Sequence, residues 1–136
     1  DGIRDRSPSR GLGDVYKRQV PILHKDYNPY VEAFWKWWES DLHKTLQELR
    51  VTGGEPLMSA DMWKLFDWFK DNYGKSSTRL AINSNLCPKD SLMDMMIEKS
   101  HYVKHFHVYT SNEAVGTHSE YIRDGMDWEK WSRNVC

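Results

Sequence analysis

The sequence is poor in cysteine, in long apolar runs and in net charge. Its two cysteines, Cys87 and Cys136, are too few for a disulfide framework or a four-thiolate metal site, which fits a reducing, cytoplasmic setting. No run of about 18 apolar residues occurs, so we expect no membrane-spanning segment. The formal net charge of −1 gives no electrostatic reason to expect a nucleic-acid partner.

The first residues, DGIRDRSPSRGLGDVYKRQ (1–19), show almost no hydrophobic periodicity. The nucleotides TATAAGAGACAG translate to Tyr16–Gln19 in one frame and, shifted by one base, to Ile3–Arg6. This is typical of a sequencing adapter translated into protein, so we interpret 1–19 as a disordered scar and exclude it from the fold. A genuine basic tail is the alternative. Residues 1–19 carry five Lys or Arg and three Asp, a net of +2, which leaves residues 20–136 at −3.

Helical and strand patterns alternate along residues 20–136. Seven Trp, seven Tyr and four Phe supply material for one core, and the length suits one domain. Apolar spacing predicts helices that begin at Pro29, at Ser59 or Asp61, at Pro88 or Asp90, and at Thr117. The expected strands are 46–52, 78–86 and 103–111. Strands alternating with helices predict an α/β domain with a parallel sheet and right-handed crossovers.

All three expected strands end in small, polar or acidic residues. Ligands collect at the carboxyl ends of parallel strands, so this edge is a candidate pocket. In Gly53-Gly54-Glu55-Pro56 the glycines open the backbone to a ligand, Glu55 offers an acceptor for an ammonium group, and Pro56 stiffens the exit. The lysine of a phosphate-binding loop and the third glycine of a dinucleotide fingerprint are absent. The alternative is a tight turn with a solvated acid.

The residues at these strand ends resemble those of a known protein family. ELRVTGGEPLMS resembles the second-strand motif of radical S-adenosylmethionine enzymes, LAINSNL resembles their third strand, and YTSNEA resembles their fourth-strand motif. EYIRDGMDWEKWSRNV is similar to the helix that follows, and the run from about Trp37 to Val135 resembles the subgroup with a twitch domain. The fold that this resemblance implies is part of a partial (β/α)6 barrel with parallel strands.

The resemblance also implies residue roles. Gly53, Gly54, Glu55 and Pro56 would hold the amino group of S-adenosylmethionine, and Asn83 and Asn85 would face the cofactor from the third strand. Ser111 and Glu113 would line its ribose region, and Arg123 would reach its carboxylate. Turn residues that bond their own backbone are an equal alternative for Asn83, Ser84 and Asn85.

One departure from the family is large. The Cys-x3-Cys-x2-Cys loop that holds its 4Fe–4S cluster lies upstream of the GGEP motif, and this chain has no cysteine before Cys87. We therefore expect residues 20–136 to be an internal fragment of a radical enzyme, with cofactor contacts but no catalytic residue and no metal ligand.

The resemblance implies that the parent protein cleaves S-adenosylmethionine at the cluster, giving a 5′-deoxyadenosyl radical that abstracts hydrogen from an unknown substrate, and the twitch-type resemblance points toward a peptide. One alternative is a degenerate, non-catalytic binding domain of the same fold. Another is an unrelated small α/β nucleotide binder.

Overall fold

The computed structural model describes residues 27–123 and 125–135, and the chain divides into two compact units, residues 1–37 and 38–136. The described element of the first unit is helix α2, Pro29–Trp37. The Asn28 side chain accepts a hydrogen bond from the Tyr30 N–H at 3.0 Å, and Pro29 is the first helical residue. The predicted helix start is therefore confirmed, because proline lacks the N–H that a first turn leaves unpaired.

The second unit begins with a π-helical turn, η1 (Trp38–Leu42), and a short helix, α3 (His43–Thr45). The sequence predicts regular helix up to about Lys44, so the π-helical turn is a difference. Trp38 lies in this turn, is fully buried and packs edge-to-face against Trp68 and Phe69. A π-helical turn bonds i to i+5 and takes up extra residues, which the spacing of apolar residues does not reveal.

Three parallel strands form an open sheet in the order β1-β2-β3. They are β1 (Glu48–Val51), β2 (Arg79–Asn83) and β3 (Phe106–Tyr109), each shorter than predicted. Val51 pairs with Ile82, and Ile82 pairs with Val108, so the three strands end at one edge. The predicted α/β class and parallel sheet are confirmed, and the sheet is small and open.

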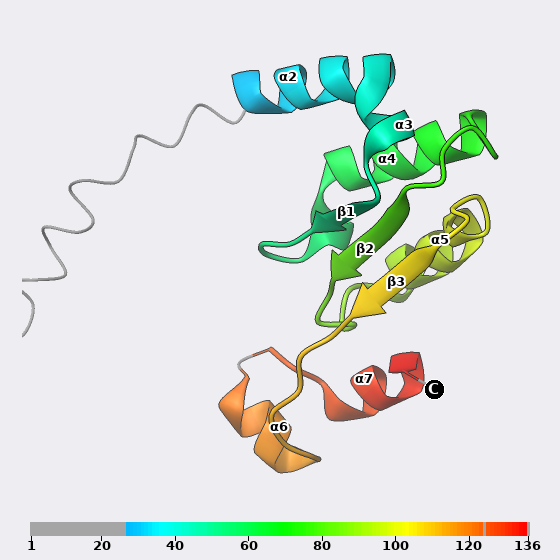
Figure 1. The fold of residues 1–136 in the computed structure, drawn as a ribbon. Coiled ribbons are helices and arrows are strands. Elements are labelled where there is room, and N and C mark those ends of the chain that lie inside the picture. The colour runs from blue at the N-terminus through cyan, green and yellow to red at the C-terminus, as the bar shows by residue number, and fades with distance from the viewer. Residues whose placement is uncertain (1–26, 124, 136) are drawn as a thin grey trace, which may run out of the picture. The chain divides into compact units, whose positions relative to one another are not determined.

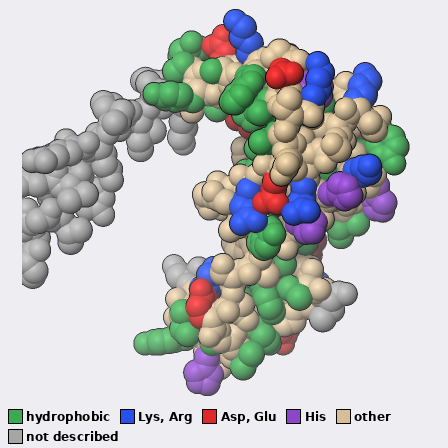
Figure 2. Space-filling view, in the orientation of Figure 1, with side chains coloured by type: hydrophobic (Ala, Val, Ile, Leu, Met, Phe, Trp, Pro, Cys, Tyr) green, Lys and Arg blue, Asp and Glu red, His purple; other side chains and the backbone are tan. Residues whose placement is uncertain are grey.

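Helices α4 (Ala60–Asp71) and α5 (Asp90–Ser100) lie on one face of this sheet (Figure 1). Leu80 and Ile82 are fully buried there, and Phe66 of α4 meets Phe106 edge-to-face with ring centroids 5.5 Å apart. On the other face, Glu48 pairs with Arg50 and Arg79 at 2.9 and 3.1 Å. Figure 2 shows red and blue side chains gathered at the level of the sheet. This division explains the alternation of apolar and charged residues along the strands.

Two short helices follow β3, α6 (Thr117–Ile122) and α7 (Trp128–Val135), and they lie beyond the carboxyl ends of the strands (Figure 1). The Thr117–Glu120 spacing is that of a capping box, but the structure shows none. Gly116 precedes α6 as its cap, without a side-chain bond. Instead, the Glu120 carboxylate accepts a hydrogen bond from the Trp128 N–H at 3.0 Å, so it caps the start of α7.

Helix α7 is bonded to the ends of the strands. Trp131 donates from its indole N–H to the Thr110 hydroxyl at 3.0 Å, just beyond β3. Asn134 donates to the Leu86 carbonyl at 2.7 Å, beyond β2. The two contacts hold the region after β3 against the loop after β2.

Candidate functional site

The turn after β1 is open to solvent. Gly53 has a φ of +124°, a conformation that side chains rarely adopt, so glycine is required there. A Cβ built at Gly53 or Gly54 would meet no atom within 4 Å, and both residues are exposed. The main-chain N–H and C=O groups of this turn are therefore within reach of a ligand.

The Glu55 carboxylate is bonded within the chain. It accepts hydrogen bonds from the Leu57 N–H at 3.2 Å and the Asn85 N–H at 2.9 Å. The Ser84 hydroxyl lies 2.9 and 3.0 Å from its two oxygens. Glu55 is half-buried and links the end of β1 to the end of β2, so its carboxylate is bonded within the chain as well as partly exposed to solvent. A carboxylate has about four acceptor sites, and three donors leave about one for an ammonium group.

Pro56 is buried and opens a short 3₁₀ helix, η2 (Pro56–Met58). Glu55 caps this helix through its bond to the Leu57 N–H. The pair therefore fixes the exit from the glycine turn toward α4, as the sequence predicts for Pro56.

The loop after β2 is strained. Leu86 has a φ of +56°, the only positive value at a non-glycine residue in the described part of the chain. Such a conformation costs about 1–2 kcal/mol. Three hydrogen bonds hold it: the Leu86 N–H donates to the Ser84 hydroxyl at 3.0 Å, the Cys87 N–H donates to the Asn85 side chain at 2.9 Å, and Asn134 donates to the Leu86 carbonyl. Asn85 and Ser84 thus act as turn residues that bond their own backbone, one of the predicted alternatives.

Two adjoining pockets lie at this edge of the sheet. One has a volume of about 290 Å³ and is lined by Asn85, Cys87, Ser111, Arg123, Gly125 and Met126. The other has a volume of about 200 Å³ and is lined by Gly53, Gly54, Asn83, Ser84, Asn85, Tyr109, Ser111 and Arg123. Together they fall within the range of about 300–1,000 Å³ that is usual for small-molecule sites.

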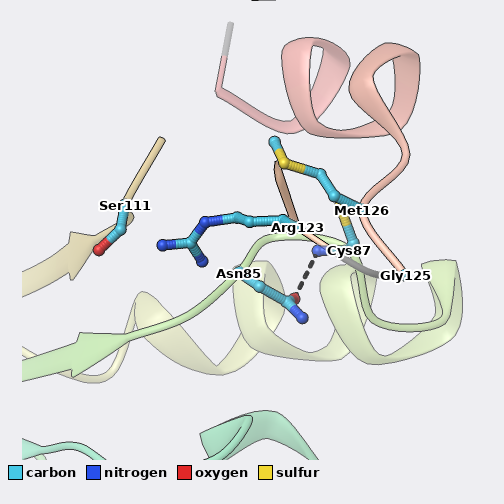
Figure 3. Close-up of a pocket in the computed structure, with 6 residues that line it drawn as sticks. All are labelled: Asn85, Cys87, Ser111, Arg123, Gly125 and Met126. Carbon is cyan, nitrogen blue, oxygen red and sulfur yellow. Dashed lines mark hydrogen bonds between the residues drawn. The ribbon is translucent and has the colours of Figure 1, made fainter. Parts of the chain in front are cut away.

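Asn85, Ser111 and Arg123 line both pockets and form their common wall. In Figure 3 the Arg123 side chain extends toward Ser111 and Asn85. Among the described residues that line either pocket, Arg123 alone carries a formal charge. An anionic ligand group would therefore meet the guanidinium first.

Arg123 forms a two-pronged ion pair with Glu113. Its Nε and Nη2 donate to the two Glu113 carboxylate oxygens, each at 2.6 Å. These hydrogen bonds hold the pKa of Glu113 below its ordinary value and raise the pKa of Arg123. The pair joins the segment before α6 to the residue that follows it, and uses two of the five N–H donors of the guanidinium.

The structure brings together most of the residues that the sequence singles out. Six of the nine predicted cofactor contacts line the two pockets: Gly53, Gly54, Asn83, Asn85, Ser111 and Arg123. Glu55, Pro56 and Glu113 do not line them. Glu55 and Glu113 instead bond to residues that line the pockets. Glu55 accepts hydrogen bonds from Ser84 and Asn85, and Glu113 accepts hydrogen bonds from Arg123. Those two side chains organise the wall.

Five residues of the pocket walls were not among the nine predicted contacts: Ser84, Cys87, Tyr109, Gly125 and Met126. Tyr109 could have been found, since it is the last residue of β3 and lies at the carboxyl end of the sheet, where ligands collect. Gly125 and Met126 lie between α6 and α7 and reach the pocket through the turn of the chain there. No spacing in the sequence marks that position.

The described residues do not fit an iron–sulfur cluster. Across residues 27–123 and 125–135, no three His, Cys, Asp or Glu side chains come together to hold a metal ion, and Cys87 is a free thiol. Three thiolates would be needed. The same part of the chain contains no helix with the length and apolar character needed to cross a membrane.

Comparison of the chain with protein-family models, with curated proteins and with solved structures finds no match.

Proposed function

We propose that this chain is the S-adenosylmethionine-binding part of a radical S-adenosylmethionine enzyme. The observation that carries the proposal is the convergence of six predicted contacts, from three strand ends and the end of α6, on one pair of pockets. The open three-stranded sheet would then be part of a partial barrel, with the pockets at the edge where such folds bind ligands.

The lining residues suit the parts of the cofactor. The pocket beside Gly53 and Gly54 offers main-chain carbonyls to an ammonium group, and Glu55 holds the exit of this turn through its bond to the Leu57 N–H. Arg123 offers N–H donors to the carboxylate, and the exposed Ser111 hydroxyl offers a partner for the ribose. The other pocket, beside Met126, would accept the adenine, since a thioether packs well against an aromatic ring.

In the proposed parent enzyme, a 4Fe–4S cluster held elsewhere would supply the electron for cleavage of S-adenosylmethionine. The described residues supply no ligand set for that cluster, so we assign no part of that step to them. The proposal requires its thiolates to come from residues outside 20–136. What this chain does is bind and orient the cofactor.

Ligand binding by the chain tests the first part of the proposal. Isothermal titration calorimetry with S-adenosylhomocysteine should show binding, and ATP should not compete. Ser111→Ala should weaken binding by about 2- to 10-fold through loss of one hydrogen bond, whereas Ser91→Ala, at an exposed position of α5, should not. Tighter binding of ATP than of S-adenosylhomocysteine would favour an unrelated nucleotide binder.

The second part needs the longer gene product. Reading the gene upstream of Val20 should give an in-frame Cys-x3-Cys-x2-Cys loop, and the product, reconstituted anaerobically with iron and sulfide, should show a 4Fe–4S signal by electron paramagnetic resonance. The single free cysteine of the described chain favours a second candidate, a non-catalytic binding domain of the same fold. That candidate predicts S-adenosylhomocysteine binding together with no cluster signal.

A further inference from the structure

The carboxylate-binding group of the site already has a carboxylate bound to it. Arg123 reaches both pockets, yet its Nε and Nη2 are taken by Glu113 at 2.6 Å. Paired donors of this kind match any carboxylate equally well, because the guanidinium recognises the planar pair of oxygens. A ligand carboxylate that approaches this edge of Arg123 would therefore compete with Glu113 for the same two N–H groups.

The charge of the pocket walls depends on the same pair. Arg123 is the one charged side chain among the described lining residues, and Glu113 neutralises it. With the pair intact, an anion would meet three remaining N–H donors and no net positive charge. With Glu113 displaced, the anion would meet the full positive charge of Arg123 and the two N–H donors that Glu113 had occupied.

The pair is open enough to exchange. The side chains of Arg123 and Glu113 are 34% and 47% exposed, so water can solvate either group when they separate. Pairs with this exposure contribute little to stability, and this allows a ligand to replace Glu113. The neighbouring Asn112 side chain accepts a hydrogen bond from the buried Ser119 at 2.6 Å, which holds the segment in place while Glu113 moves.

We propose that Glu113 is an internal competitor that occupies the carboxylate-binding edge of Arg123 until the carboxylate of a ligand replaces it. This rests on the proposed function for the identity of the ligand. It makes Glu113 a specificity-determining residue: ligands with a carboxylate displace it, and ligands without one bind beside an intact pair. It also differs from the ribose contact that the family resemblance implies for Glu113.

The test compares two nucleosides that differ in the carboxylate. S-adenosylhomocysteine carries an amino acid, and methylthioadenosine has the same nucleoside without it. By calorimetry, Glu113→Gln should bind S-adenosylhomocysteine about 2- to 5-fold more tightly than the unaltered chain, the range expected for release of an exposed pair. Its affinity for methylthioadenosine should not change. Glu129→Gln, at an exposed position on α7, is the matched control and should change neither.

Weaker or unchanged binding of S-adenosylhomocysteine by Glu113→Gln would overturn the inference, and weaker binding of both nucleosides would indicate the ribose contact instead. A second measurement decides the inference if neither nucleoside binds, an outcome that would refute the proposed function. Malonate is then titrated while the Arg123 Nε–H signal, assigned by its loss in Arg123→Lys, is followed by nuclear magnetic resonance. The signal should shift at lower malonate concentration in Glu113→Gln, and equal midpoints would overturn the inference.

Discussion

Replacing Glu55 with alanine should destabilise the second unit, although Glu55 lies in a surface turn. Its carboxylate accepts hydrogen bonds from three donors on two loops, the Leu57 N–H, the Ser84 hydroxyl and the Asn85 N–H. Leu57 is fully buried and Ser84 is 4% exposed, so water cannot readily replace the carboxylate at either donor. Asn85 is exposed, and water can satisfy its N–H.

The magnitude follows from the two buried donors. An unsatisfied buried donor costs about 1–3 kcal/mol, so Glu55→Ala should lower the free energy of unfolding by about 2–4 kcal/mol after partial relaxation. Each kcal/mol lowers the Tm of a unit this size by about 4–8 °C. Glu55→Gln should recover at most part of the loss, because its amide nitrogen would face a donor where the carboxylate has an acceptor.

Urea denaturation followed by tryptophan fluorescence and circular dichroism measures this change. Glu98→Ala, at an exposed position of α5, is the control and should stay within about 0.5 kcal/mol of the unaltered chain. A Glu55→Ala chain as stable as that control would refute the reasoning, since it would mean that the three bonds are replaced by water without loss.

Other predictions concern the core, the sheet and the ion pair. Phe66→Ala should cost about 3–5 kcal/mol in the same urea assay, because Phe66 is fully buried against Phe106. Thr78→Val should cost about 1–3 kcal/mol, because the buried Thr78 hydroxyl donates to the Leu46 carbonyl at 2.8 Å; a neutral result would show that this carbonyl is satisfied elsewhere. The lowered pKa of Glu113 means that its pair with Arg123 contributes stability above the ordinary glutamate pKa and loses it as the pH falls through the lowered pKa; a carboxyl carbon resonance of Glu113 that titrates at or above the ordinary value would contradict this. The outer edges of β1 and β3 have no strand partner among the described residues, so sedimentation should show concentration-dependent association, and a monomer at all concentrations would argue against exposed edges.

The order of helices and strands could be read from the sequence because it depends on local patterns. Gly53 is one example of such a local pattern. A glycine pair after an apolar run predicts an open turn, and Gly53 has a φ of +124° in the structure. Pro29 likewise marks a helix start through its own missing N–H. The strand ends were less predictable. Strand pairing stops where side-chain hydrogen bonds replace the main-chain hydrogen bonds between strands. The Thr78 hydroxyl, for example, donates to the main-chain carbonyls of His43 and Leu46, which are distant in the sequence.

The residues at the candidate site could be predicted from the sequence, but the hydrogen bonds and ion pairs between them could not. Ser111 and Arg123 were expected to approach one ligand, and they do share the wall of both pockets. That Glu113 would already hold Arg123 was not predicted, because spacing indicates that residues are near one another but not which of several partners an arginine takes. Glu120 shows the same limit: its spacing from Thr117 suggested a cap for α6, and the folded chain uses it for α7.

The two acidic residues of the site should therefore have opposite effects on ligand binding. Glu55 accepts from three donors and fixes the glycine turn that lines one pocket, so an ammonium group there would meet a site already in place. Glu113 holds Arg123 through two bonds, so a ligand carboxylate that takes the same edge would have to replace it. A zwitterionic ligand would then meet a preorganised site at its amine and a competitor at its carboxylate. Removing the carboxylate of Glu55 should weaken binding and removing that of Glu113 should strengthen it, although both residues are glutamates at the same edge of the sheet.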